Sequence, residues 1–211
     1  MKIIISKDFE AELTAAINRC EHDRIFVLTD TNTEKHCLPV LNNCKLSIAN
    51  YQVITIGASD LSKNLESVSH VWSELQKGGA TRHSLMINLG GGMVTDLGGF
   101  AASTFKRGIN FINIPTTLLA MVDASVGGKT GFNFGGLKNE IGVFNDADTV
   151  IINTQFLKTL DRENICSGYA EMLKHGLINR EGRRMFDELL SFDILNPNLA
   201  VLARMVGESV E

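Results

Sequence analysis

Short apolar runs of strand length alternate with stretches of helical periodicity over residues 2–153 of the chain. The apolar runs end in polar or glycine-rich turns, which is typical of buried strands. The stretches between them place apolar residues three or four positions apart, and Asp8 is a candidate N-cap for the first. The predicted strands span residues 2–6, 25–29, 51–56, 84–89, 110–114 and 149–153, and the predicted helices span 9–20, 65–76 and 93–105. This alternation predicts an α/β fold with a parallel sheet.

The pattern becomes helical after residue 162, and we expect helices over residues 164–179, 181–190 and 197–211. We therefore predict a parallel-sheet nucleotide-binding domain over residues 1–158, followed by the beginning of an α-helical domain over residues 159–211. The last apolar stripe, from Leu199 to Val210, needs a partner surface and has no cap or terminating glycine. For this reason we expect the chain to be a fragment of a longer protein.

Three consecutive glycines follow the apolar run at residues 84–89 and precede a predicted helix. Gly90, Gly91 and Gly92 permit positive φ and a close approach of another group to the backbone. A strand, a glycine turn and a helix start together form a phosphate cradle, because unpaired N–H groups point at the turn. Thr95 stands where the G-x-G-x-x-G fingerprint needs its third glycine, which disfavours the usual Rossmann dehydrogenase. The alternative is a glycine turn that only connects the two elements.

A second polar stretch follows the strand predicted at residues 110–114. It contains Thr116, Thr117, Asp123, Gly127, Gly128, Lys129 and Thr130. Open α/β sheets bind ligands at the carboxyl ends of their strands, where this stretch is expected to lie. A P-loop is excluded because its first glycine would fall at Asp123. Another polar turn, Asp30-Thr31-Asn32, ends an earlier strand; it either contacts the adenosine of a dinucleotide or is a plain Asx turn.

Composition and charge narrow the possible functions. The chain has 211 residues, 44% hydrophobic residues and a formal net charge of −4. This net charge does not indicate the basic surface that nucleic-acid binding requires. No apolar run approaches the roughly 20 residues of a membrane span. We expect a globular protein of the cytoplasm, with no nucleic-acid or membrane partner. The four cysteines form no C-x-x-C pair and are expected to be reduced thiols.

These motifs make the chain similar to the 3-dehydroquinate synthase family. The segments that carry the resemblance are residues 90–100, 107–108, 115–120, 122–131, 138–139 and 168–174. They follow the family's order over about half of the chain. The resemblance implies a Rossmann-like NAD-binding domain followed by a helical metal-binding domain. Related sugar-phosphate cyclases share much of the pattern.

The resemblance also implies which residues form the site. The expected NAD-binding residues are Asp60, Lys63, Gly91, Gly92, Met93, Asp96, Thr116, Thr117, Lys129, Lys138, Phe156, Thr159 and Leu160. The expected catalytic and substrate-binding residues are Arg107, Asp123, Lys129, Lys138, Asn139 and Lys174. Asp60 and Lys63 occupy a Glu-x-x-Lys pair that holds a ribose in the family. The alternative for this pair is a capping aspartate and a solvated lysine.

Glu171, Lys174 and His175 are three or four positions apart and share one face of a predicted helix. Without the resemblance, Glu171 and Lys174 form a surface ion pair worth a few tenths of a kcal/mol. By resemblance, Glu171 binds zinc or another divalent metal such as cobalt, and Lys174 contacts the substrate. The family's two histidine ligands are expected beyond residue 211, so we expect this chain alone to be metal-free or nearly so. His175 is expected to be a packing residue.

The activity implied by the family belongs to the shikimate pathway of aromatic amino-acid biosynthesis. It is a lyase reaction that converts 3-deoxy-arabino-heptulosonate 7-phosphate to 3-dehydroquinate and phosphate, with NAD as a catalyst. By resemblance, Arg107 reaches the site of a neighbouring subunit, which predicts a homodimer. Three positions depart from the family's pattern, namely Asp60, Ala124 and Leu137. They put individual cofactor contacts in doubt and leave the reaction in place.

Two other functions stay open at this point. The first is another sugar-phosphate cyclase, or a metal-dependent polyol dehydrogenase such as glycerol dehydrogenase. A neutral polyol would not need Lys129, Lys138 and Lys174 together, which disfavours the dehydrogenase. The second is a nucleotide-binding module without catalysis, which also describes a fragment that binds NAD without turnover.

Overall fold

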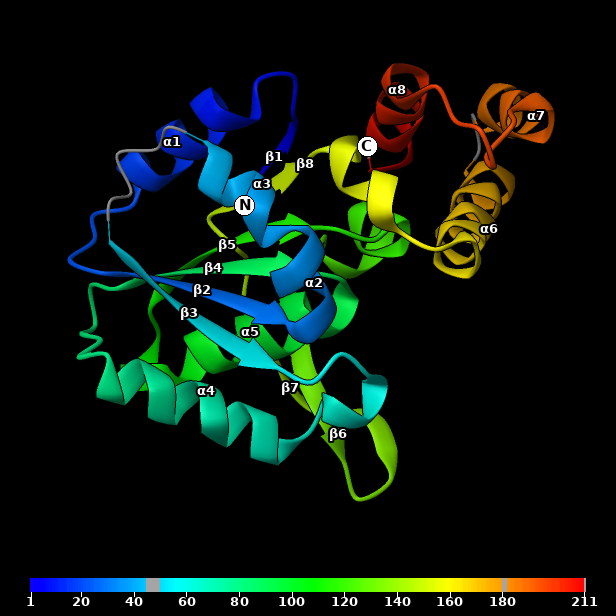
Figure 1. Cartoon of the computed structure of the whole chain (residues 1–211). Helices are drawn as coiled ribbons and strands as arrows, with labels where there is room; N and C mark the ends of the chain where they lie inside the picture. Colours follow the sequence, from blue (N-terminus) through cyan, green and yellow to red (C-terminus); the bar gives the residue numbers. More distant parts are fainter. Residues whose placement is uncertain (45–49, 180–181, 211) are drawn as a thin grey trace.

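The computed structural model describes residues 1–44, 50–179 and 182–210. Its centre is a six-stranded parallel sheet in the order β1-β8-β5-β4-β2-β3 (Figure 1). The strands are β1 (Lys2–Ile5), β2 (Ile25–Asp30), β3 (Tyr51–Ile56), β4 (Leu85–Gly90), β5 (Asn110–Pro115) and β8 (Thr149–Ile152). Every residue of β2, β4 and β8 is buried. A parallel sheet covered on both faces requires such continuous apolar strands.

Helices cover the two faces of the sheet. They are α1 (Phe9–Arg19), α2 (Thr31–His36), α3 (Leu38–Asn43), α4 (Leu65–Lys77) and α5 (Gly92–Thr104). In Figure 1, α1 lies above the sheet and α4 lies below it. Asp8 caps α1, since its side chain accepts a hydrogen bond from the Ala11 N–H. Asn64 caps α4 in the same way through the Ser67 N–H.

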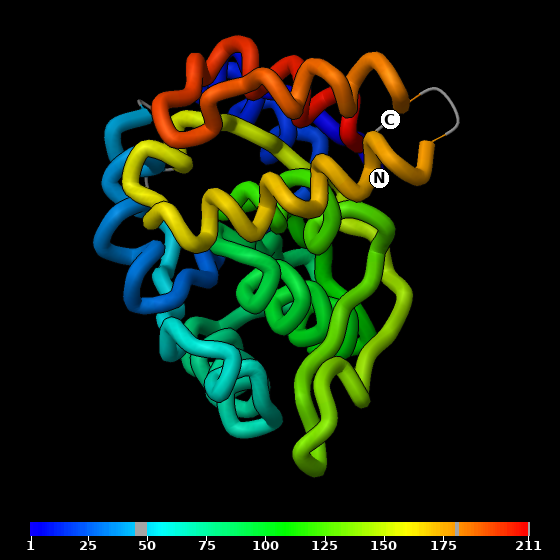
Figure 2. Tube along the Cα trace, turned by 90° about the vertical axis from the view of Figure 1, so that its right-hand side faces the viewer, coloured from blue at the N-terminus to red at the C-terminus, as the bar shows by residue number. Residues whose placement is uncertain are grey.

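The chain changes direction in the sheet at β2. From β2 it moves to β3 on one side, and it then crosses to β4 on the other side. Open α/β sheets bind ligands outside the carboxyl ends of their strands at such a switch point. Here these ends are Asp30 on β2 and Gly90 on β4. Figure 2 looks onto this edge of the sheet, with α6 (Arg162–Ile178) running across it.

Smaller elements surround the same edge. The 3₁₀-helix η1 (Asp60–Ser62) follows β3, and η2 (Phe105–Arg107) follows α5. A π-helical turn, η3 (Ala120–Ala124), follows β5, and the antiparallel hairpin β6 (Lys129–Phe134) and β7 (Leu137–Phe144) comes next. The 3₁₀-helix η4 (Thr154–Thr159) leads from β8 to α6, α7 (Arg183–Ser191) and α8 (Leu199–Val210). In the described ranges, no helix has the length and apolar character needed to cross a membrane.

The structure confirms the predicted α/β fold with its parallel sheet, and each predicted strand lies within one residue of the observed one. The predicted helix over residues 181–190 is observed as α7, and its first residue lies outside the described residues. Three features were not predicted: the short helices α2 and α3, the π-helical turn η3, and the β6–β7 hairpin.

Candidate functional site

The glycine turn between β4 and α5 leaves no room for side chains. A Cβ on Gly91 would lie 2.9 Å from Thr117 Cγ2, and a Cβ on Gly92 would lie 2.9 Å from the Ala124 Cβ. The Thr116 N–H donates to the Gly90 carbonyl at 3.0 Å, which fixes the next loop beside the turn. Gly91 is the N-cap of α5 and provides no side-chain acceptor. The first N–H groups of a long buried helix therefore face this turn, as an anion-binding cradle requires.

A cavity of about 320 Å³ opens beside this turn at the switch point. Its lining includes the predicted NAD-binding residues Gly91, Thr116, Thr117, Phe156, Thr159 and Leu160, together with Asp30 and Asn32. Asp30 is also the N-cap of α2, because its Oδ1 accepts from the N–H groups of Asn32 and Thr33 at 2.8 and 2.9 Å. The polar turn after β2 is therefore a helix cap that also lines the cavity.

A second cavity, of about 540 Å³, lies between α5, η3 and the β6–β7 hairpin. Four predicted site residues line it: Asp96, Asp123, Lys129 and Asn139. The pKa of Asp96 is raised above its ordinary value, chiefly by burial and further by the charge of Asp123, while Lys63 and Lys129 oppose the rise. The cavity therefore holds carboxylates and ammonium groups close enough to influence one another.

Lys63 is buried although it is a lysine, and its side chain joins three elements. The residue is 5% exposed, and its Nζ donates to Asp96 Oδ2 on α5 at 2.6 Å. The same Nζ donates to Asn139 Oδ1 on β7. Nearby, Lys138 Nζ lies 3.0 Å from Asp60 Oδ2 in a largely exposed pair. The alternative of a solvated Lys63 is therefore wrong.

Helix α6 packs against the η3 segment through a glycine. A Cβ on Gly168 would lie 2.6 Å from Leu118 Cβ and 2.7 Å from the Leu118 carbonyl carbon. This close contact places the Glu171 face of α6 over the sheet edge. The pKa of Lys174 is raised, first by its hydrogen bond to Glu171 and also by the charge of Asp123 on η3. Lys174 on α6 is therefore close enough to Asp123 on η3 for their charges to interact.

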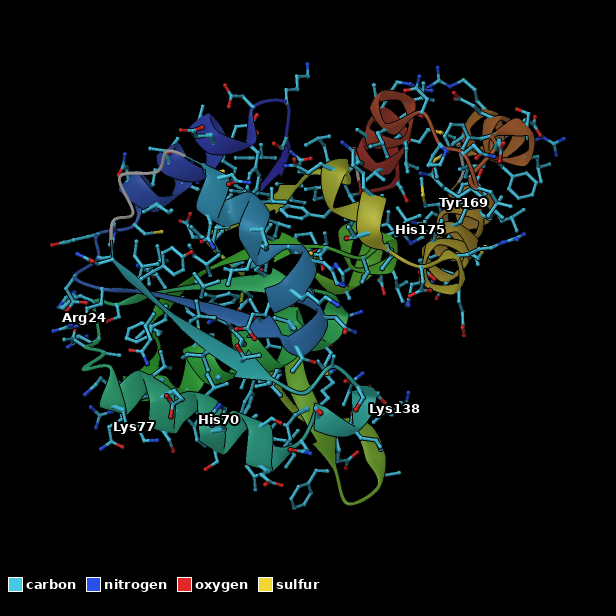
Figure 3. All side chains as sticks on the ribbon, in the orientation of Figure 1. Arg24, His70, Lys77, Lys138, Tyr169 and His175 are labelled. Carbon is cyan, nitrogen blue, oxygen red and sulfur yellow. The ribbon has the colours of Figure 1, made fainter. Side chains whose placement is uncertain are left out.

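His175 makes polar contacts in addition to packing. Its Nε2 lies 3.2 Å from Glu171 Oε1, and its Nδ1 lies 2.7 Å from Ser209 Oγ on α8. Lys174 Nζ also contacts Glu171 Oε1. Glu171 is thus held by two neighbours on its own helix. Figure 3 shows His175 on α6 and Lys138 on the hairpin on the same side of the molecule.

Arg107 lies apart from the other predicted site residues. It is exposed and follows the carboxyl end of α5, whereas Gly92 begins that helix. Since a helix rises 1.5 Å per residue, the two ends of α5 are about 20 Å apart. Lys106 and Arg107 both have positive φ, of 50° and 71°, which side chains rarely adopt. The predicted contact of Arg107 with a neighbouring subunit stays a prediction.

The residues at Glu171 do not make a complete metal site. Over residues 1–44, 50–179 and 182–210, no group of three or more His, Cys, Asp or Glu side chains could hold a metal ion. A catalytic zinc ion normally takes three protein ligands and keeps one open position. Within the described residues, Glu171 is therefore not part of a three-ligand cluster.

One site feature was missed in the sequence although a signal for it was present. Gly135 and Gly136 have φ of 59° and 82° and form the turn of the β6–β7 hairpin. Two glycines between short alternating segments are a hairpin signal. The hairpin brings Asn133 and Asn139 beside η1, as the hydrogen bond from the Asn133 amide to the Asp60 carbonyl shows.

Comparisons with known proteins agree with this geometry. The family model described as 3-dehydroquinate synthase N-terminal matches residues 53–167. The 3-dehydroquinate synthase of Parabacteroides distasonis is 48% identical over 209 residues, which are 99% of this chain and 58% of that protein. The 3-dehydroquinate synthase of Pyrococcus furiosus is 42% identical over 76% of this chain and 50% of that protein. The chain therefore spans little more than half the length of these curated relatives.

Two solved structures share the fold. A 2-deoxy-scyllo-inosose synthase complexed with carbaglucose-6-phosphate, NAD+ and Co2+ superposes with a TM-score of 0.88 at 21% identity, over 99% of this chain and 58% of that one. The 2-epi-5-epi-valiolone synthase ValA from Streptomyces hygroscopicus, with NAD+ and Zn2+ bound, superposes with a TM-score of 0.81 at 27% identity, over 99% of this chain and 59% of that one.

Proposed function

Because the chain belongs to the 3-dehydroquinate synthase family, we propose that the full-length protein converts 3-deoxy-arabino-heptulosonate 7-phosphate to 3-dehydroquinate and phosphate. The observation that carries the proposal is the pair of neighbouring cavities at the sheet edge. One contains the glycine cradle, and the other contains Asp96, Asp123, Lys129 and Asn139. A dinucleotide and an anionic substrate need these two environments side by side.

The glycine cradle supports NAD as the cofactor. Side chains at Gly91 and Gly92 would fill the space beside Thr117 and Ala124, so the backbone stays open to a pyrophosphate. We assign Gly91 to Met93 to the pyrophosphate and Asp96 to the nicotinamide half. When bound, NAD would supply a hydride acceptor that later returns the hydride. ValA, which has the same fold, binds NAD+.

Lysines around the second cavity support a substrate that carries a carboxylate and a phosphate. Lys129 lines that cavity, and Lys174 lies close enough to Asp123 for its pKa to respond. A lysine is protonated at neutral pH, and the raised pKa of Lys174 favours the charged form further. Lysine provides a point charge that suits a phosphate oxygen. We propose that Lys129 and Lys174, with Lys138 and Asn139 on the hairpin, orient this substrate.

Glu171 is our proposed ligand for a divalent metal, either zinc or cobalt, with the remaining ligands supplied by parts of the protein outside this chain. Such a metal would act as a Lewis acid toward a substrate hydroxyl. In this chain, Lys174 and His175 both contact the Glu171 carboxylate. Both contacts orient the carboxylate, and the Lys174 ammonium balances its charge. We also propose that this chain alone binds NAD without turnover, and that the full-length protein is a homodimer in which Arg107 enters the partner's site.

Phosphate release from the sugar phosphate, with NAD+ and Zn2+, tests the proposed activity. We expect release by the full-length protein and none by the 211-residue chain alone. The Lys129→Met variant of the full-length protein should lose about a hundredfold in kcat/KM, because a charged contact to the reacting phosphate disappears. Lys77→Met provides the control, since Lys77 is an exposed lysine on α4.

Different results would point to the alternatives. Lasting NADH formation from a polyol, without phosphate release, would replace the proposal by a dehydrogenase. Phosphate release from other sugar phosphates alone would indicate a different cyclase. NAD+ binding by the full-length protein without any turnover would indicate a nucleotide-binding module.

A further inference from the structure

Asn133 lies at an irregularity of the β6–β7 hairpin. Phe132 pairs with Ile141 and Phe134 pairs with Leu137, so Asn133 alone on β6 lies opposite residues 138–140 on β7. The extra residues of this irregularity therefore belong to β7, and such bulges often lie next to active sites. Asn133 makes its hydrogen bonds toward the segment of η1 instead of continuing the regular ladder. The Asn133 N–H donates to the Lys63 carbonyl at 2.8 Å, and its side-chain amide donates to the Asp60 carbonyl at 3.3 Å.

The third contact of Asn133 holds the turn that carries Lys138 and Asn139. The Oδ1 of Asn133 accepts from the Asn139 N–H at 3.0 Å. Asn139 has a φ of 52°, in the left-handed region, so its conformation needs external support. The Asn139 side chain in turn accepts from Lys63 Nζ. Lys63, Asn139 and Asn133 thus form a closed ring of hydrogen bonds.

This ring and the bond from the Asn133 amide to the Asp60 carbonyl connect the segment of η1 with the hairpin. Among the described residues, the pair between Lys138 and Asp60 also joins them, with side chains that are 78% and 56% exposed. Exposed pairs of this kind contribute little and allow both side chains to move. Asn133 contacts main-chain atoms on both elements, and these atoms set the relative positions of Asp60, Lys63, Lys138 and Asn139.

We propose that Asn133 is a positioning residue that aligns the hairpin with the cofactor-binding segment. This inference rests on the proposed function, which assigns Asn139 to the substrate, and on the family resemblance, which implies that Asp60 and Lys63 hold the NAD ribose. Through its amide nitrogen, Asn133 holds the segment that binds the cofactor. Through its amide oxygen, it holds the turn that contacts the substrate. The binding of NAD+ therefore depends on the amide nitrogen of Asn133, and the binding of the substrate depends on its amide oxygen.

Two substitutions at Asn133 in the full-length protein separate these contacts. Asn133→Ala removes both side-chain hydrogen bonds, and we expect the Kd for NAD+ and the KM for the sugar phosphate each to rise about fivefold to tenfold. Asn133→Asp keeps an acceptor for the Asn139 N–H and loses the donor to Asp60. It should restore the KM for the sugar phosphate and leave the Kd for NAD+ raised.

Asn145→Ala is the matched control. Asn145 follows the same hairpin, and its side chain donates to Ser103 Oγ at 2.7 Å at the end opposite the β6–β7 turn. We expect it to leave both constants within twofold of the wild type. The inference is overturned if Asn133→Ala leaves both constants unchanged, if Asn133→Asp fails as completely as Asn133→Ala, or if Asn145→Ala has the same effects.

The failure of the proposed function would be visible separately. If the wild-type protein releases no phosphate from the sugar phosphate, the proposed activity is wrong, whatever the variants do. The Kd for NAD+ still decides on Asn133 in that case, because it is measured by calorimetry without turnover. An unchanged Kd in Asn133→Ala then overturns the inference, and a raised Kd with a normal Asn145→Ala supports it.

Discussion

The two walls of the second cavity are built on different physical principles. One wall consists of α5 and η3. Helix α6 does not line the cavity but packs against this wall, where a glycine brings backbone into direct contact, as at Gly168 against Leu118. The other wall consists of the β6–β7 hairpin, to which η1 is hydrogen-bonded, and every residue of β7 is exposed or half-buried. Polar contacts such as the one between Lys63 and Asn139 hold it in place.

This difference assigns different roles to the walls. Close-packed backbone cannot shift without a steric cost, so the first wall keeps Asp123, Lys174 and Glu171 in a fixed arrangement. Hydrogen bonds at a surface contribute only about 0.5–1.5 kcal/mol each, so the second wall can adjust when a ligand competes for its polar groups. The structure thus combines a rigid wall with an adjustable one.

The largest effect is expected from a side chain at the contact between α6 and η3. Gly168→Val would force atoms into Leu118, where a Cβ alone already lies 2.6 Å from the Leu118 Cβ. We expect the free energy of unfolding to fall by about 3 kcal/mol, which lowers the melting temperature by about 6–12 °C. Calorimetry measures both quantities.

Gly207→Ala is the control for this substitution. Gly207 is also a helical glycine, but a Cβ there would meet Ile5 Cγ1 at an ordinary 3.4 Å. Alanine has the better helix propensity, so this variant should be neutral or gain up to about 1 kcal/mol. If Gly168→Val proved as stable as Gly207→Ala, the first wall would not be rigid.

An intermediate effect is expected at the buried ion pair between the two walls. Lys63→Met leaves the Asp96 carboxylate without its ammonium partner, and the two side chains are only 7% and 18% exposed. We expect a loss of about 2 kcal/mol in the free energy of unfolding at neutral pH, below the full cost for a completely buried pair. Lys77→Met is the control, because its partner Glu74 forms an exposed pair with it. Urea unfolding measures both variants.

The pH dependence of this effect follows from Asp96. Burial raises the pKa of Asp96 above its ordinary value of 3.8. The folded state therefore binds this proton more tightly than the unfolded state, and the contribution of Asp96 to stability falls as pH rises from 3.8 through the folded pKa. Without Lys63 that pKa rises further. The loss caused by Lys63→Met should thus be smaller near pH ~4 than at neutral pH; an equal loss at both would mean that the charge of Asp96 is not involved.

The smallest effect is expected at the exposed pair on the second wall. Lys138 and Asp60 lie 3.0 Å apart, with side chains that are 78% and 56% exposed. Lys138→Met should change the free energy of unfolding by less than about 0.5 kcal/mol. Arg183→Met, at the similarly exposed pair with Asp187, is the matched comparison in the same urea experiment. A loss above about 1 kcal/mol for Lys138→Met, with no such loss for Arg183→Met, would contradict this expectation. The pair would then contribute more to stability than exposed ion pairs do.

The parallel sheet was predictable because three of its strands, β2, β4 and β8, are buried along their whole length. The run of apolar residues that forms β4 is a direct consequence of burial on both faces. The hairpin was harder to predict, since β7 has no buried face and its sequence Leu-Lys-Asn-Glu-Ile-Gly-Val-Phe shows no strong period. Only its two-glycine turn carried a local signal.

The site was predictable in its residue types but not in its contacts. The glycine turn and the lysines were identified by their order in the chain. The burial of Lys63 was not, because it depends on Asp96 and Asn139, which are 33 and 76 positions away. The contact of His175 with Ser209 likewise joins two helices whose relative positions no local pattern encodes. Long-range pairing of this kind follows from the assembled fold.

The pairing of β1 with β8 has a consequence for how the protein is made. Lys2 lies opposite Thr149 in the parallel register, so the first strand has no neighbour in the sheet until the last one exists. At about 5–20 residues per second, the ribosome needs roughly 7–30 s to supply the intervening chain. During this time the apolar segment Ile3–Ile5 remains without its strand partner. The first strand to be synthesised is therefore among the last to be paired, and a chaperone that binds short apolar segments would find it during synthesis.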